Sequence, residues 1–163
     1  MSRAFVKEDG PDNTPLPDLP ISPHPNYVTP RGLAQLQASL AQAQGRLAKL
    51  RGRAERLDRL PEAAAERDIR YFEARLKTAI VILPDALGCD VVRFGHVIDV
   101  IDAEGRTAQY QIVGEDEADA AQGLIAPHAP LARALLGAQC GDVVMWRRPV
   151  GPVELEITGI SWP

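Results

Sequence analysis

The architecture of this chain is decided by residues 29–57, which read TPRGLAQLQASLAQAQGRLAKLRGRAERL. Apolar residues recur in this stretch in alternating steps of three and four, over more than three heptads. They are Leu33, Leu36, Leu40, Ala43, Leu47, Leu50, Ala54 and Leu57. The residues between them favour helix, and Thr29-Pro30 has the form of an N-cap followed by proline at the first helical position. The stretch therefore predicts a long helix with a single apolar seam.

A second stretch repeats this spacing after residues 58–61. Its apolar positions are Ala65, Ile69, Phe72, Leu76 and Ala79. Pro61 suits the first turn of a helix, and the negative charge of Glu62 favours a helix N-terminus. Because one seam needs another to cover it, we expect the two helices to form an antiparallel hairpin over residues 29–83, with its turn near residues 58–62.

Beyond residue 83 the sequence changes to short β-branched stretches separated by turn residues. The pattern predicts strands at residues 91–94, 97–101, 108–113, 143–146 and 153–157, and one short helix at residues 129–137. The fold class is therefore expected to be α+β, with an antiparallel sheet module at residues 84–163. Repeated prolines in residues 1–28 predict an extended or disordered arm ahead of the hairpin.

Charge is distributed unevenly along the 163 residues, whose net charge is −4. Residues 31–83 hold eleven Lys or Arg against six Asp or Glu, a net of +5, whereas residues 84–163 hold five against twelve, a net of −7. This division indicates two surfaces with different partners, unless the charges only keep both surfaces solvated. The mild overall acidity argues against a free-standing binder of duplex DNA.

No apolar run approaches the ~18 residues that a membrane span needs, and the first residues lack the apolar core of a signal peptide. A cytoplasmic protein is therefore expected. Cys89 and Cys140 have no CxxC or histidine spacing around them, so we interpret them as reduced thiols.

Motifs of autonomous catalysis are missing from the sequence, which has no P-loop, no GxGxxG and no HExxH. A cluster of carboxylates does occur at the expected turn, where Asp58 and Glu62 are flanked by Glu55 and Glu66. Acids at the tip of a protruding element can coordinate a divalent cation. Asp before a turn and Glu in a first helical turn are equally ordinary capping residues, so both interpretations stay open.

Several strings along residues 27–163 point together to one family. In the C-terminal module they are VRFG at 92–95, YQIVGEDEAD at 110–119, APLARALLG at 129–137 and GDVV at 141–144. In the hairpin they are TPRGL at 29–33 and ERDIRYFEARL at 66–76. In this combination and order they resemble the bacterial Gre transcript-cleavage factors, GreA and GreB.

The resemblance implies an N-terminal coiled-coil hairpin followed by an FKBP-like domain, with RNA polymerase as the partner. In that family the globular domain docks at the rim of the polymerase's secondary channel. The hairpin enters the channel, where acids at its tip help the polymerase's own Mg²⁺ site to cleave backtracked RNA. A factor of this kind is not itself an enzyme and has no cofactor of its own, and we expect a monomer.

Carried over to this chain, the resemblance makes Asp58 and Glu62 the candidate tip acids. The candidate residues for polymerase docking are Pro127, His128, Pro130 and Arg133. Basic residues of the hairpin are expected to face the 3′ end of the nascent RNA, since a positive groove suits single-stranded nucleic acid. They are Arg51, Arg53, Arg56, Arg59 and Arg67.

Three other functions remain open at this point. The family's tip string, Gly-Asp-Leu-x-Glu-Asn-Ala-Glu-Tyr, is absent, so the chain could occupy the channel without stimulating cleavage. Nucleoside diphosphate kinase regulators share a Gre-like C-terminal domain and have short hairpins, which makes a module that binds another protein an alternative. FKBP-like folds also include prolyl isomerases, but a shared fold is only an analogy.

Overall fold

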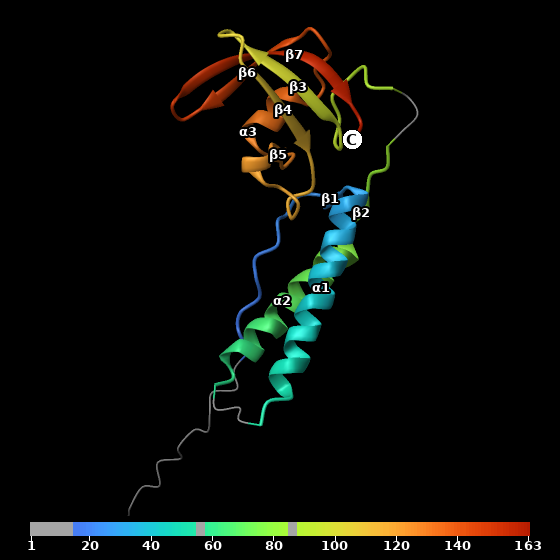
Figure 1. The fold of residues 1–163 in the computed structure, drawn as a ribbon, viewed down its shortest axis with the longest axis vertical. Coiled ribbons are helices and arrows are strands. Elements are labelled where there is room, and N and C mark those ends of the chain that lie inside the picture. Colours follow the sequence, from blue (N-terminus) through green and yellow to red (C-terminus); the bar gives the residue numbers. More distant parts are fainter. Residues whose placement is uncertain (1–14, 55–57, 85–87) are drawn as a thin grey trace, which may run out of the picture. The chain divides into compact units, whose positions relative to one another are not determined.

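The computed structural model describes residues 15–54, 58–84 and 88–163 (Figure 1). The described chain falls into two compact units. The helical unit lies within residues 1–23 and 37–77, and the sheet unit lies within residues 24–36 and 78–163. The fold therefore combines two long helices with a curled sheet, in agreement with the expected α+β class.

The first long helix, α1, spans Pro30–Arg51. It begins where the sequence predicts, because the Gly32 N–H donates to the Thr29 hydroxyl over 2.9 Å, which is an N-cap bond. The predicted seam continues to Leu57, but α1 ends at Arg51 and Gly52 follows in a turn. The Gly52 N–H still donates to the Ala48 carbonyl, but the Arg53 N–H donates to the Leu50 carbonyl, only three residues back, so the α-helical pattern ends there. Ala54 thus lies outside the helix, and Leu57 is outside the described residues.

The second long helix, α2, spans Leu60–Thr78. The Asp58 carboxylate accepts a hydrogen bond from the Leu60 N–H over 2.9 Å and so satisfies one free donor at the start of α2. Glu62 is consequently part of the helix and not of the connection. The prediction that the turn lies at residues 58–62 is wrong in this respect, because the two helices are joined by residues 52–59.

Contacts between α1 and α2 show how the two helices run. Arg46 pairs with Asp68, and further along α1 Arg51 pairs with Glu66 over 2.6 Å. As the residue number rises along α1, the number of its partner on α2 falls, so the two helices are antiparallel. Ala43 and Leu47 of the predicted seam are buried on α1, and Ala65 is buried on α2. The seam is thus the apolar side of this helix pair.

The arm ahead of β1 has no helix or strand in residues 15–26, as its prolines predict. Arg70 of α2 holds it at two points. The Arg70 Nε donates to the Asp18 carboxylate over 2.6 Å, and its guanidinium also donates to the Leu16 carbonyl over 2.8 Å.

The sheet unit contains a five-stranded sheet in the order β5-β4-β3-β7-β6. Its strands are β3 at Val97–Asp102, β4 at Thr107–Ile112, β5 at Leu124–Ile125, β6 at Val143–Arg148 and β7 at Gly151–Ser161. Neighbouring strands are antiparallel except β4 and β5, which pair in parallel. The prediction of a wholly antiparallel sheet is therefore wrong. The short 3₁₀ helix η1, Ala120–Gln122, turns the chain back so that β5 enters the sheet in this direction.

Other elements also differ from the prediction. Residues 91–94 form no strand, because Val91 makes only an isolated bridge to Gln139. Two further strands, β1 at Tyr27–Val28 and β2 at Ile80–Val81, pair in parallel and were not foreseen. The helix α3 spans Pro130–Leu135, inside the predicted residues 129–137.

The core of the sheet unit lies between the sheet and α3 (Figure 1). It consists of Val92, Ile98, Val100, Ile112, Ile125, Leu131, Ala132, Leu135, Leu155 and Ile157. Among the residues that the structure describes, no helix is both long and apolar enough to cross a membrane.

Candidate functional site

The two candidate tip acids occupy different environments at the start of α2. Asp58 is exposed, and one of its oxygens accepts the Leu60 N–H. Glu62, in the first turn of α2, is only 4% exposed. A metal ion at a protruding tip needs carboxylate oxygens that face outward. The described geometry therefore supports a capping role for Asp58 and does not present the two carboxylates as one exposed ligand pair.

The candidate basic residues of the hairpin mostly have partners within the hairpin. Arg51 pairs with Glu66 over 2.6 Å and Arg67 with Asp68 over 3.1 Å. The Arg53 Nε donates to the Leu50 carbonyl over 3.3 Å. Arg59 is half-buried, and Arg56 lies outside the described residues. The positive charge of Arg51 and Arg67 is thus balanced locally.

The four docking candidates lie together in one loop-and-helix segment. After β5 the Ala129 N–H reaches the Ala126 carbonyl over 3.0 Å, which closes a turn around Pro127 and His128. Pro130 then occupies the first turn of α3, where its missing N–H costs nothing. Core residues on the buried side of α3 hold this helix, and Arg133 stays exposed.

His128 has two neighbours that belong to distant parts of the sequence. Its ring stacks on the ring of His24, with a centroid separation of 3.6 Å and an interplanar angle of 24°. Its Nε2 lies 3.7 Å from a carboxylate oxygen of Glu115. Sequence reasoning identified His128 but missed His24, because nothing local to His24 indicates a partner in residues 126–130.

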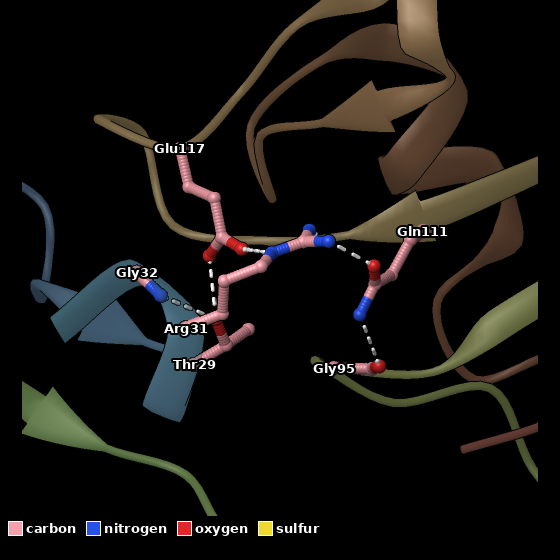
Figure 2. A network of polar contacts seen from close by, with 6 residues as sticks. All are labelled: Thr29, Arg31, Gly32, Gly95, Gln111 and Glu117. Carbon is pink, nitrogen blue, oxygen red and sulfur yellow. Dashed lines mark hydrogen bonds and ion pairs between the residues drawn. The ribbon is translucent and has the colours of Figure 1, made fainter. Parts of the chain in front are cut away.

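A buried carboxylate, Glu117, joins the start of α1 to the sheet (Figure 2). The Thr29 hydroxyl donates to its Oε2 over 2.6 Å, and the Arg31 Nε donates to its Oε1 over 2.6 Å. The side chain of Glu117 is only 1% exposed. Burial of a carboxylate is tolerated when charged and polar donors satisfy it, as they do here.

The same network continues from Arg31 to strand β4 (Figure 2). The Arg31 guanidinium donates to the Gln111 side-chain oxygen over 3.3 Å, and the Gln111 amide donates to the Gly95 carbonyl over 3.1 Å. These bonds hold the first turn of α1 in a defined register with the sheet. Gln111 and Glu117 both lie in residues 110–119, one of the strings that carry the family resemblance. Membership of this string was the one sequence signal that could have marked them as functional residues.

In the described ranges, no group of three or more His, Cys, Asp or Glu side chains is placed to hold a metal ion. Cys89 and Cys140 are both free thiols.

Comparison with known proteins identifies similar transcription elongation factors. A family model described as "Transcription elongation factor, GreA/GreB, C-term" matches residues 87–161. The transcription elongation factor GreA of Alkalilimnicola ehrlichii is 41% identical over 103 residues, which are 62% of this chain and 65% of that protein. The chain thus spans slightly less than two thirds of this relative's length.

The transcription elongation factor GreA of Nitratidesulfovibrio vulgaris (strain Miyazaki F) is 38% identical over 108 residues, which are 62% of this chain and 68% of that protein. Among solved structures, GreA factor homolog 1 (Gfh1) of Thermus thermophilus covers 85% of this chain and 99% of its own, with 22% identity. Its TM-score of 0.42 is too low to bear on the present fold. The sequence relatives and the family model together show that this chain belongs to the GreA/GreB family.

Proposed function

We propose that this chain is a transcription elongation regulator that binds RNA polymerase and has no catalytic activity of its own. The observation that carries the proposal is the 38% identity to a protein named transcription elongation factor GreA, over 68% of that protein's length. Any chemical step would belong to the polymerase and its own Mg²⁺, in the cytoplasm, and the factor would act as a monomer.

The proposed mode of binding uses the two units differently. The sheet unit, taken as FKBP-like, docks at the rim of the secondary channel through Pro127, His128, Pro130 and Arg133. The helices α1 and α2, taken as a coiled-coil hairpin, enter the channel toward the 3′ end of the RNA. The antiparallel ion pairs between α1 and α2 and the buried seam residues Ala43 and Leu47 support this use of the hairpin.

Two roles inside the channel follow from the tip acids. In the first role, Asp58 and Glu62 assist the polymerase in cleaving backtracked RNA. In the second, the hairpin occupies the channel without stimulating cleavage. The second role is favoured by two observations at the start of α2, namely the bond from the Leu60 N–H to Asp58 and the 4% exposure of Glu62.

Binding of purified core polymerase tests the proposal directly. We expect the full chain to bind, and Arg133→Ala to weaken binding about fivefold or more, since arginine side chains within an interface contribute strongly to binding. The matched control is Arg147→Ala, at another exposed arginine, on β6, which should bind like wild type. Absence of binding even at low salt would contradict the proposal and favour a regulator of another protein, such as a nucleoside diphosphate kinase.

A cleavage assay on stalled, backtracked elongation complexes separates the two roles. Shortening of the transcript that is lost in the Asp58→Ala, Glu62→Ala double variant would establish the tip acids, with the exposed Glu73→Ala on α2 as control. Shortening that survives in the double variant would exclude the tip-acid mechanism. A chain that binds but causes no shortening would be a channel occupant.

A further inference from the structure

His24 lies in the arm just ahead of β1, and its side chain is exposed. Pro23 and Pro25 restrict the backbone on both sides of it. Two residues further on, the Asn26 amide donates to the Thr78 hydroxyl over 3.3 Å, next to the pairing of β1 with β2. The His24 ring that stacks on His128 therefore belongs to a segment with a restricted backbone.

We propose that His24 is part of the polymerase-docking surface, where it positions the ring of His128 and adds its own exposed face to the contact. This inference rests on the proposed function, because His128 is itself a docking candidate. The stack at 3.6 Å restricts rotation of the His128 ring, and Glu115 lies 3.7 Å from the His128 Nε2. A ring that is oriented before the partner arrives loses less conformational freedom on binding, which strengthens the contact.

The chemistry of this surface fits an arginine-bearing segment of the polymerase. The exposed His24 ring can stack against a planar guanidinium, and the carboxylate of Glu115 lies 3.7 Å from Nε2 of the adjoining His128 ring. The module that carries His128 is acidic as a whole, since residues 84–163 hold five Lys or Arg against twelve Asp or Glu. A basic partner segment is therefore attracted to this surface as well as recognised by it.

Variants of His24 in the full chain, titrated with core polymerase, test the role of the stack. His24→Ala should weaken binding about fivefold, because the His128 ring must then be ordered on binding and the surface loses one ring. His24→Phe keeps a planar ring over His128 and should bind within about twofold of wild type. The melting temperature of His24→Ala should fall by at most about 2–4 °C, since the exposed His24 contributes one aromatic pair, and that of His24→Phe should stay close to wild type. The matched control is Asp18→Ala, which removes a different contact of the same arm and should not change binding.

A double-mutant cycle connects the two rings. If His24 acts through His128, then His24→Ala should weaken binding much less in a His128→Ala background than in wild type. Glu115→Gln should also weaken binding, with an effect that shrinks as salt increases. Unchanged binding in Glu115→Gln would exclude the arginine-bearing partner.

The failure of this inference can be distinguished from failure of the proposed function. If wild type binds polymerase and His24→Ala binds equally well or more tightly, His24 is not part of the docking surface and only the present inference is overturned. If wild type does not bind polymerase at all, the proposed function and this inference both fall.

Discussion

The Arg31 Nε lies 2.6 Å from Oε1 of Glu117, although the two residues are 86 positions apart in the sequence. The pair is asymmetric, because the Glu117 side chain is 1% exposed and that of Arg31 is 52% exposed. A buried carboxylate depends on its donors far more than a surface carboxylate does. The Arg31–Glu117 pair consequently links the start of α1 to the sheet, and loss of Arg31 would leave the Glu117 charge buried with one donor fewer.

Thr29→Ala should lower the free energy of unfolding by about 2–3 kcal/mol, because it removes an N-cap bond and one donor to a buried charge. The Thr29 hydroxyl both accepts from the Gly32 N–H and donates to Glu117. Urea unfolding followed by circular dichroism measures the change. Thr29→Ser keeps the hydroxyl and is the control; an equal loss in both variants would contradict the hydrogen-bond explanation.

Gly32→Ala should destabilise the protein, whereas Gly45→Ala on the same helix should stabilise it by about 0.5–1 kcal/mol through helix propensity. A Cβ at Gly32 would lie 2.5 Å from Oε2 of Glu117, while a Cβ at Gly45 would meet nothing within 4 Å. The two substitutions are chemically identical, so each controls the other. If the melting temperature rose in both variants, the Glu117 carboxylate would have to move away from residue 32 at little cost in stability.

Leu47→Ala should cost about 2–4 kcal/mol, whereas Arg51→Ala should cost less than about 1 kcal/mol. Leu47 is buried in the seam, but the Arg51–Glu66 pair is largely exposed, with side-chain exposures of 54% and 38%. Chemical unfolding at low and high salt measures both, and only the Arg51→Ala effect should depend on salt. A larger loss in Arg51→Ala than in Leu47→Ala would mean that ion pairs hold the hairpin.

Asp102→Asn should reduce stability near neutral pH and have no effect in strong acid. The backbone N–H of Arg106, and then its guanidinium, hold the pKa of the Asp102 carboxyl below its usual value of 3.8. Because the pKa is lower in the folded state, the stabilisation is fully present above about pH 3.8 and is lost as the pH falls through the folded value.

Melting temperatures of wild type and Asp102→Asn, compared from about pH 7 down into this acidic range, measure the effect. The gap between the two should close as the pH falls. Glu154→Gln, which removes an exposed carboxylate on β7, is the control. A gap that widens toward low pH would contradict the assigned direction of the shift.

The helices were largely predictable from the sequence because their signals are local. Thr29-Pro30 marks the start of α1, and the heptad spacing identifies the buried residues Leu36, Ala43 and Leu47. The end of α1 was predicted too late, since the seam continues past Gly52 while the helix does not. The apolar spacing does not show this end, where the Arg53 N–H bonds the Leu50 carbonyl and the α-helical hydrogen-bond pattern stops.

The sheet was predictable only in part. Strands β3, β4 and β6 and the middle of β7 show β-branched or alternating residues and were found, but the two-residue strands β1, β2 and β5 were not. A strand of two residues carries no periodicity, so it is defined by its partner and not by its own sequence. At residues 91–94 the error is the opposite one, because a strand was predicted where the structure has none. Val92 is buried in the core without belonging to a strand.

By itself, the sequence determined the family, the long helix pair and the loop that carries Pro127, His128 and Pro130, because each is written in contiguous residues. The tertiary structure alone decided that His24 stacks on His128 and that Arg31 and Thr29 bind Glu117. It also decided that Glu62 is buried and Asp58 exposed. These relationships depend on chain segments brought together by packing, and no local pattern records which distant side chain will satisfy a given charge or cover a given ring.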